Sequence, residues 1–168
     1  MAVTITRVNR EAEPVIQNLV QLYTYDFTEF WAGTHRGDLL PDGKFDGYPL
    51  ERYWGEPNWL AMLIWCDGIL AGFALVNDIG HSGEPVDHNM AEFFVLRKYR
   101  GLGVARAAAE FVFSDYPGLW EVAVARKNLR AYAFWSGVIN GSGKATDIYE
   151  PEENIEHWNG PIIRFRWD

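Results

Sequence analysis

Three cations and two glycines lie close together at residues 97–104, which read Arg-Lys-Tyr-Arg-Gly-Leu-Gly-Val. They separate an apolar run at 90–96, which predicts a buried strand, from an alanine-rich run at 104–113, which predicts a helix. The first N–H groups of a helix have no intrahelical partners and lie at the positive end of the helix dipole, so they attract anions. Glycines there let the backbone approach a bulky group closely. Residues 97–104 therefore indicate a site for a phosphate-bearing ligand.

Spacing alone leaves two ordinary interpretations of this segment open. Basic residues after a strand are common in solvated turns, and Gly-x-Gly before a helix occurs in loops that bind nothing. Spacing does exclude two nucleotide-binding loops, because position 106 is arginine rather than the third glycine of Gly-x-Gly-x-x-Gly, and no Gly-Lys-Ser/Thr is present. The expected ligand is therefore neither a dinucleotide nor ATP.

A second motif lies downstream, where residues 128–135 read Asn-Leu-Arg-Ala-Tyr-Ala-Phe-Trp after a strand-like run at 119–125. Arg100–Ala105 resembles the Arg/Gln-x-x-Gly-x-Gly/Ala signature of the GNAT superfamily of acyl-CoA-dependent N-acyltransferases, and residues 128–135 resemble that family's Asn-x-x-Ala-x-x-Phe-Tyr helix. The two motifs have the family's order and distance, and with the adjoining strands the resemblance covers most of the chain. It implies a single GNAT domain over residues 1–168 that moves an acetyl group from acetyl-CoA to a primary amine.

The resemblance also implies where acetyl-CoA binds. Backbone amides of residues 100–105 would hold its pyrophosphate, and the end of the preceding strand would face the thioester. The residue at the start of the downstream helix would cap that helix and contact the pantetheine arm. The implied cofactor-binding residues are Val95, Leu96, Arg100, Gly101, Leu102, Gly103, Val104, Ala105 and Asn128.

Acetyl transfer to an alkylamine requires a base, because an ammonium group with a pKa of about 10.4 must lose a proton before or during attack. The period of two in a strand puts Glu92, Phe94 and Leu96 on one face, where burial would raise the pKa of Glu92 towards that of a general base. Some GNAT enzymes use a strand glutamate in this region. Glu92 could equally bind a neighbouring loop or the substrate cation. The same period of two puts His88 on this face as a second candidate base. The alternative is that His88 lies in a surface turn at the start of the strand.

The position that would supply a proton to the leaving CoA thiolate departs from the family pattern. Many GNAT members have tyrosine after the motif phenylalanine, but this chain has Trp135, and an indole has no useful acidity. Tyr132 lies three residues earlier on the same helix, so it could share the face of Trp135 and act as the acid. The alternatives are that Tyr132 belongs to the core or that water protonates the thiolate.

Aromatic and acidic residues alternate at 23–31, a segment that the resemblance places in the wall around the acceptor. Carboxylates and aromatic faces together suit a cationic amine. We therefore expect Asp26 and Glu29 to bind the substrate, which would be a small cationic amine or an amino-terminal group. A helix N-cap is the alternative role for Asp26.

The composition limits the classes of function. A chain of 168 residues that is 48% hydrophobic is long enough for one domain with its own core. Its net charge of -8 argues against sequence-independent nucleic-acid binding, which needs a basic surface. No apolar stretch reaches the roughly 18–20 residues that span a bilayer, and residues 1–12 lack the pattern of a signal peptide. We expect a cytoplasmic protein without nucleic-acid or membrane partners.

Cysteine and histidine usage indicates no further chemistry. The single Cys66 has apolar neighbours, which predict a buried side chain rather than a nucleophile. The four histidines lack metal-ligand spacing, so no metal is expected. The oligomeric state stays open between a monomer and a homodimer. Two other classes of function also stay open, a CoA-binding sensor without turnover and an interaction module without acyl-CoA affinity.

The expected elements alternate along the chain. We expect strands at 3–8, 58–66, 69–79, 90–96, 119–125, 144–149 and 161–167, and helices at 10–23, 26–31, 104–113 and 128–135. Asp67-Gly68 predicts a hairpin between the second and third strands. Residues 33–57 show no period and predict a long loop, with a turn of helix near 49–53. This pattern predicts an α/β protein of the α+β type, with a mixed, mostly antiparallel sheet and flanking helices. The resemblance implies the order β-α-α-β-β-β-α-β-α-β.

Overall fold

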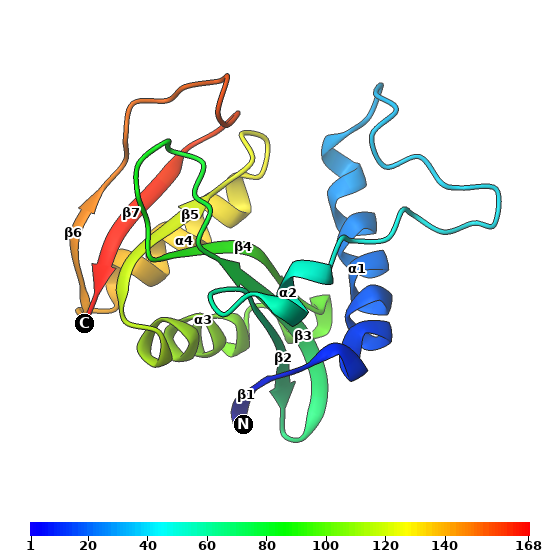
Figure 1. Ribbon diagram of the computed structural model, residues 1–168, viewed down its shortest axis with the longest axis horizontal. Helices are drawn as coiled ribbons and strands as arrows, with labels where there is room; N and C mark the ends of the chain where they lie inside the picture. Colours follow the sequence, from blue (N-terminus) through cyan, green and yellow to red (C-terminus); the bar gives the residue numbers. More distant parts are fainter.

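A computed structural model describes all 168 residues, and its centre is one seven-stranded sheet with the strand order β1-β2-β3-β4-β5-β7-β6 (Figure 1). Neighbouring strands are antiparallel except β4 and β5, which are parallel. The strands are β1 (Val3–Arg7), β2 (Leu60–Cys66), β3 (Ile69–Asn77), β4 (His88–Val95), β5 (Gly118–Ala123), β6 (Ala145–Tyr149) and β7 (Ile162–Trp167). The expected mixed, mostly antiparallel sheet is confirmed.

Four α-helices flank this sheet, with short 3-10 turns between elements. They are α1 (Glu13–Phe27), α2 (Glu51–Gly55), α3 (Val104–Asp115) and α4 (Leu129–Gly141), with η1 (Arg10–Ala12), η2 (Thr28–Phe30) and η3 (Arg97–Tyr99). The order is β-α-α-β-β-β-α-β-α-β-β, which has one more closing strand than the order that the resemblance implied. None of the helices combines the length and apolarity required to cross a lipid bilayer.

The sheet is apolar on both faces, because alternate residues of its central strands serve two different cores. Leu60 and Met62 of β2 pack in the cluster that contains α3 and α4 residues, whereas Ala61 and Leu63 pack in the cluster that contains Ile16 of α1. Helices α3 and α4 therefore cover one face, and α1 and α2 cover the other (Figure 1).

The β2–β3 hairpin turns as the sequence predicts. Asp67 and Gly68 have φ angles of 50° and 77°, so both central residues are left-handed, as a type I′ turn requires. Cys66 and Ile69 pair directly across the turn. A glycine and an aspartate are among the residues that adopt this backbone region at low cost, which is why these two residues specify the hairpin.

Helix α1 differs in its bounds from the expected 10–23. The chain first makes the η1 turn, and α1 then runs from Glu13 to Phe27 with Pro14 tolerated in its first turn. The expected helix at 26–31 is divided between the end of α1 and η2. Asp26 consequently lies in the last turn of α1, which rules out the N-cap role considered for it.

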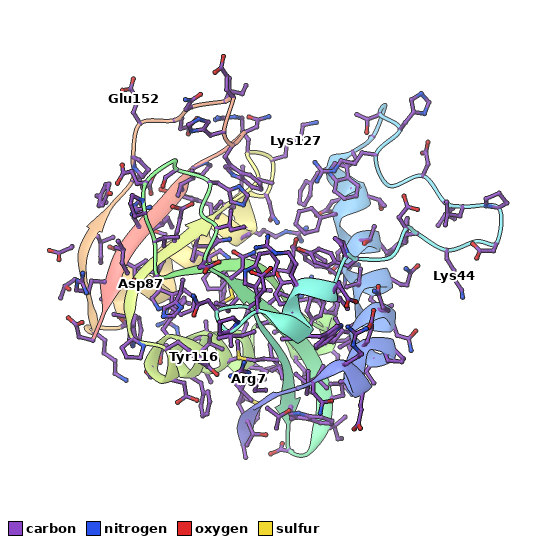
Figure 2. The ribbon with its side chains drawn as sticks, viewed as in Figure 1. Arg7, Lys44, Asp87, Tyr116, Lys127 and Glu152 are labelled. Carbon is purple, nitrogen blue, oxygen red and sulfur yellow. The ribbon has the colours of Figure 1, made fainter.

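A long loop at residues 31–50 joins η2 to α2 and extends away from the sheet (Figure 1). Figure 2 shows Lys44 at its outer edge, pointing into solvent. Two glutamines of α1, four residues apart, hold this loop against the helix. Gln17 pairs with both the N–H and the carbonyl of Tyr48, at 3.0 and 2.8 Å, and Gln21 pairs in the same way with Phe45, at 2.8 and 3.0 Å. The loop is therefore ordered by side chains rather than by a backbone ladder.

Strand β4 contains a bulge that changes which residues share a face. Leu75 of β3 pairs with Glu92, but the next residue pairs with Met90, so one residue of β4 is left over. Met90 packs in the α3/α4 cluster, and the ring of His88, two residues earlier, lies 4.8 Å from that of Trp120, which belongs to the same cluster. The prediction that His88 shares the face of Glu92 was wrong, because the period of two does not continue through a bulge.

Strands β4 and β5 separate soon after they meet. They pair only at His88–Trp120 and Asn89–Glu121, although β4 continues to Val95 and β5 to Ala123. The later residues of the two strands therefore leave an opening within the sheet, between the helices of its two faces. Residues 90–95 of β4 therefore have one edge that no strand covers.

Candidate active site

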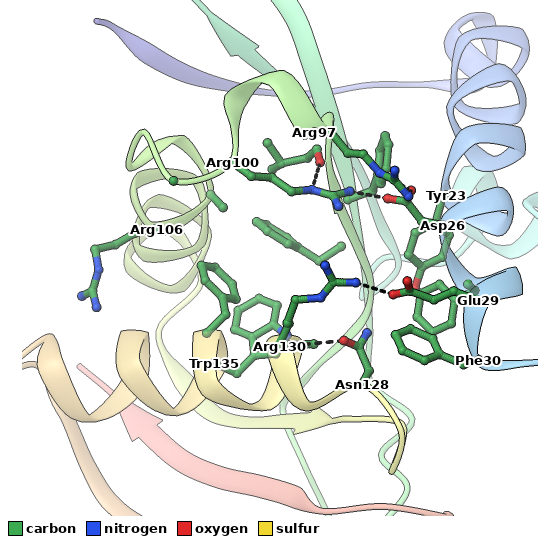
Figure 3. A pocket seen from close by; sticks show the side chains of 18 of the residues that line it. Tyr23, Asp26, Glu29, Phe30, Arg97, Arg100, Arg106, Asn128, Arg130 and Trp135 are labelled. Atoms are coloured by element: carbon green, nitrogen blue, oxygen red, sulfur yellow. Dashed lines mark hydrogen bonds and ion pairs between the residues drawn. The ribbon is translucent and has the colours of Figure 1, made fainter.

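A cavity of about 500 Å³ lies where β4 and β5 separate. Figure 3 shows side chains entering it from α1 and η2 on one side, and from α4 and the turn before α3 on the other. Its lining residues are Tyr23, Asp26, Phe27, Glu29, Phe30, Phe93, Phe94, Val95, Arg97, Arg100, Gly101, Gly103, Ala105, Arg106, Asn128, Arg130, Ala131, Phe134 and Trp135. Most of the expected cofactor residues and both expected acceptor carboxylates are thus brought together.

The glycine-rich turn contributes backbone rather than side chains. Gly101 and Gly103 have φ angles of 75° and 84°, a region that favours glycine, and both line the cavity. Gly103 is the N-cap of α3, and no side chain accepts from the first amides of that helix. Leu102 is 55% exposed and Val104 is fully buried in the core, so neither side chain lines the cavity. The start of α3 therefore presents unpaired N–H groups that can bind an anion.

The edge of β4 directs its polar groups into the opening. The carbonyl of Phe94 points towards β3, where a Cβ added to Gly72 would lie 1.9 Å from it. Alternate residues of a strand direct their N–H and carbonyl groups to opposite edges, so those of Phe93 and Val95 point away from β3. The carbonyl of Val95 accepts a hydrogen bond of 2.8 Å from Nε of Arg100, which agrees with this direction.

Leu96 behaves differently from Val95. Its N–H donates to the carbonyl of Ala71 at 2.8 Å, and its side chain packs with the α1/α2 cluster. Leu96 does not line the cavity, whereas Val95 does. Of the two residues expected to face a thioester, the structure brings only Val95 to the opening.

Glu92 has one tyrosine on each carboxylate oxygen. The hydroxyl of Tyr48 donates to Oε1 at 3.0 Å, and the hydroxyl of Tyr23 donates to Oε2. Burial raises the pKa of Glu92 above its usual value, and the hydrogen bonds from the two tyrosines offset only part of that rise. Glu92 lies on the α1/α2 face with Phe94, as the strand period predicted, but it is not among the lining residues and Tyr23 is.

The acidic residues of α1 and η2 pair with cations from across the cavity. Asp26 accepts from Nε of Arg97 at 2.9 Å and also pairs with Arg100, while Glu29 pairs with Arg130 of α4 (Figure 3). The side chain of Asp26 is 18% exposed. Both carboxylates therefore face the cavity, and in this state Asp26 is paired with two arginines and Glu29 with one.

Helix α4 supplies the opposite wall. Asn128 is its N-cap, and its Oδ1 accepts from the N–H of Ala131 at 3.1 Å. Trp135 is 6% exposed and packs edge-on against Phe93, with 5.0 Å between the ring centroids. Tyr132 is not brought to the cavity, because its hydroxyl donates to Glu150 at 2.6 Å and both residues line a separate pocket. Three residues of separation did not put Tyr132 and Trp135 on the same wall.

Sequence reasoning missed two groups of the site. Tyr48 lies in a loop without a sequence pattern and Tyr23 in a segment that shows only alternating aromatic and acidic residues, so neither pattern indicates that both bind Glu92. Arg130 lies within the second motif and pairs with Glu29, but the family pattern gives no role to that position. The alternating aromatic and acidic residues at 23–31 were the one signal that pointed towards Tyr23.

Comparison with known proteins agrees with this geometry. The model of the acetyltransferase (GNAT) family matches residues 17–137, and the chain therefore belongs to the GNAT acetyltransferase family. No curated protein matches the sequence significantly. The recognition of the family and of its fold from two short motifs is thus confirmed.

Solved structures share this fold at low sequence identity. A GNAT acetyltransferase from Staphylococcus aureus Mu50 is 15% identical with a TM-score of 0.63, and the match covers 99% of this chain and 100% of that one. An acetyltransferase from Thermus thermophilus is 14% identical with a TM-score of 0.64, covering 98% of this chain and 96% of that one. The PaiA N-acetyltransferase of Thermoplasma acidophilum, in complex with coenzyme A, is 11% identical with a TM-score of 0.58, covering 100% of both chains.

Proposed function

We propose that this protein is an N-acetyltransferase that moves the acetyl group of acetyl-CoA to a primary amine. One observation carries the proposal: the uncapped start of α3, the outward-facing edge of β4 and the Glu92–Tyr23 pair meet at one cavity. The coenzyme A bound to the Thermoplasma acidophilum PaiA structure, which has the same fold, supports this choice of donor. Membership of an acetyltransferase family supports the reaction class.

The donor would be held by backbone and by two polar side chains. The free amides at the start of α3 suit the pyrophosphate, and the positive φ of Gly101 and Gly103 lets that backbone approach it closely. Arg100 adds a positive charge beside the turn, and Asn128 offers its amide to the pantetheine arm. Arg97 and Lys98 extend the positive field in a protein whose net charge is -8.

The edge of β4 would act on the thioester. The N–H groups of Phe93 and Val95 point into the opening and can donate to the carbonyl oxygen as negative charge develops on it. Glu92, whose raised pKa suits a general base, takes a proton from the alkylammonium acceptor. The neutral amine forms the C–N bond as the C–S bond breaks, and water carries the remaining excess proton from nitrogen to the thiolate. No enzyme acid is required for this last transfer.

The acceptor would be a small cationic amine or an amino-terminal group. Aromatic rings of α1 and η2, among them Phe27 and Phe30, line the cavity beside Asp26 and Glu29. When donor phosphates bind the arginines, these carboxylates lose their partners and can bind an ammonium group. Asp26 and Glu29 are therefore proposed to recognise the acceptor in the donor-bound state.

The test of this function is release of CoA thiol from acetyl-CoA in the presence of putrescine, tyramine or a tetrapeptide with a free amino terminus. Thermal stability is measured alongside, because acetyl-CoA at 100 times its Kd should stabilise the fold by about 2.7 kcal/mol, which is several degrees. Stabilisation without thiol release would indicate a CoA-binding sensor. If acetyl-CoA neither stabilises the fold nor releases thiol, acetyl-CoA binding is refuted altogether.

A pair of glycine variants localises the donor. Gly103→Glu puts a side chain and a negative charge at the start of α3 and should abolish acetyl-CoA binding. Gly143→Glu is the matched control, since Gly143 has a φ of 70°, has open space around it as Gly103 does, and lies outside the cavity lining. If both folded variants keep the acetyl-CoA affinity of the wild type, the pyrophosphate does not bind at α3.

A further inference from the structure

Two tyrosines donate to Glu92, and they differ in what else they contact. Tyr48 comes from the long loop and reaches Oε1, while Tyr23 comes from α1 and reaches Oε2. Only Tyr23 also lines the cavity, and Glu92 itself does not. Of the residues bound to this carboxylate, only Tyr23 therefore connects it to the cavity.

The ring of Tyr23 is held in this position by its aromatic neighbours. It packs edge-on against Phe27, Phe73 and Phe94, with ring centroids 4.9, 5.7 and 5.9 Å away. Phe94 is the residue between the two β4 positions whose amides point into the opening. The ring of Tyr23 is thus packed against the strand segment where acetyl transfer would occur, while its hydroxyl is bound to the carboxylate of Glu92.

We propose that Tyr23 is the group that contacts the acceptor amine and that it relays the amine proton to Glu92. The ammonium nitrogen gives one proton to Oη of Tyr23 as the hydroxyl proton of Tyr23 moves to Oε2 of Glu92. The neutral amine then forms the C–N bond while the C–S bond breaks, water carries the remaining excess proton from nitrogen to the thiolate, and Glu92 later returns its proton to solvent. This inference rests on the proposed acetyltransferase function.

The same geometry explains how the site works with tryptophan at position 135. The expected thiolate acid Tyr132 binds Glu150 outside the cavity, and Trp135 has no acidity to offer. Tyr23 comes from the opposite wall and is the only tyrosine among the cavity-lining residues. In this arrangement the phenol handles the proton of the incoming amine rather than that of the leaving thiolate.

Tyr23→Phe and Tyr48→Phe form a matched pair, because each removes one hydroxyl from the same carboxylate. With tyramine and acetyl-CoA, Tyr23→Phe should lower kcat by about 100-fold or more, the scale of general acid–base catalysis, and leave the KM for acetyl-CoA unchanged. Tyr48→Phe should lose less than about tenfold. Equal losses in the two variants would overturn the relay and leave Tyr23 as a hydrogen-bond donor only.

The pH profile separates a relay from a packing role. In the wild type, kcat should decrease as the pH is lowered, because Glu92 becomes protonated; this decrease is the acid limb of the profile. Tyr48→Phe should keep this acid limb at a higher pH, whereas Tyr23→Phe should lose it, because Glu92 no longer takes the proton. An acid limb that persists in folded Tyr23→Phe would contradict the proposal.

Circular dichroism and acetyl-CoA-dependent thermal stabilisation establish that both variants fold and bind the donor. If the wild type releases no thiol with any amine, the proposed function fails before the relay is tested.

Discussion

Glu92 illustrates what a sequence can and cannot predict about one residue. The strand period puts Glu92 on the face of Phe94, and it lies there because the strand between them is regular, with no bulge. Its partners come from 69 and 44 residues away along the chain, and no local pattern links Tyr23 or Tyr48 to it. His88 was assigned to the wrong face because a bulge, which depends on pairing with β3, lies between it and Glu92.

The first prediction at this scale concerns pH. Burial raises the pKa of Glu92, so kcat/KM for the amine should fall as the pH drops through that raised value, where this proposed base becomes protonated. Tyr48→Phe removes a donor that favours the charged carboxylate, so the pKa should rise further and the acid limb should move to higher pH. Profiles of kcat/KM for both proteins provide the measurement. A limb that moves to lower pH would mean that Tyr48 does not stabilise the carboxylate.

The second prediction concerns stability. Because the pKa of Glu92 is higher in the folded than in the unfolded protein, its ionisation opposes folding above the unfolded value of about 4.3. Glu92→Gln should therefore unfold at a higher urea concentration than the wild type at pH 7. The difference should shrink as the pH falls through the folded pKa and vanish below about pH 4. A glutamine variant that is less stable at pH 7 would show that the two tyrosines more than offset the cost of burial.

At the scale of elements, α1 organises one wall of the cavity through side chains spaced along the helix. Gln17 and Gln21 hold the long loop, Tyr23 reaches Glu92, and Asp26 reaches the cations before α3. The helix itself was predicted from its apolar period, but the loop was not, because its order comes from glutamine side chains that carry no hydrophobic signal. The two motifs predicted the turn before α3 and the cap of α4 well, since glycine φ angles and capping are local properties.

The third prediction concerns the ion pairs between α1 and the turn before α3. Asp26→Asn frees Arg97 and Arg100, so acetyl-CoA should bind about two- to fivefold more tightly, the scale of an exposed ion pair. The KM for the amine should rise at the same time. Calorimetric titration with acetyl-CoA and amine kinetics measure the two effects. Glu152→Gln, which removes an exposed charge that has no ion pair, is the control. Weaker acetyl-CoA binding by Asp26→Asn would show that Asp26 positions the arginines rather than competing for them.

At the scale of the whole molecule, the cavity lies where β4 and β5 stop pairing, and a buried ion pair links β5 to β7 at that point. Glu121 of β5 and Arg164 of β7 are 0% and 2% exposed and pair at 2.6 Å, directly where β4 and β5 stop pairing. The same two side chains bind Ser82 and the carbonyl of Pro85, which fixes the loop between β3 and β4. Apolar periods predicted the strands, but a buried ion pair between residues 43 positions apart has no sequence signature.

The fourth prediction tests this buried pair. Glu121→Ala leaves the buried Arg164 guanidinium with only the half-exposed Glu84, 3.6 Å from its Nε, as an ion-pair partner, so the free energy of unfolding should fall by about 3–5 kcal/mol in urea titrations. Glu121→Leu with Arg164→Met should cost less than the sum of the two single variants, because no buried charge is left unpaired. Glu110→Ala breaks the exposed Arg106 pair and should cost less than about 0.5 kcal/mol. Equal losses for Glu121→Ala and Glu110→Ala would mean that water reaches Arg164. The strands beside the opening would then be held in place by their backbone pairing alone.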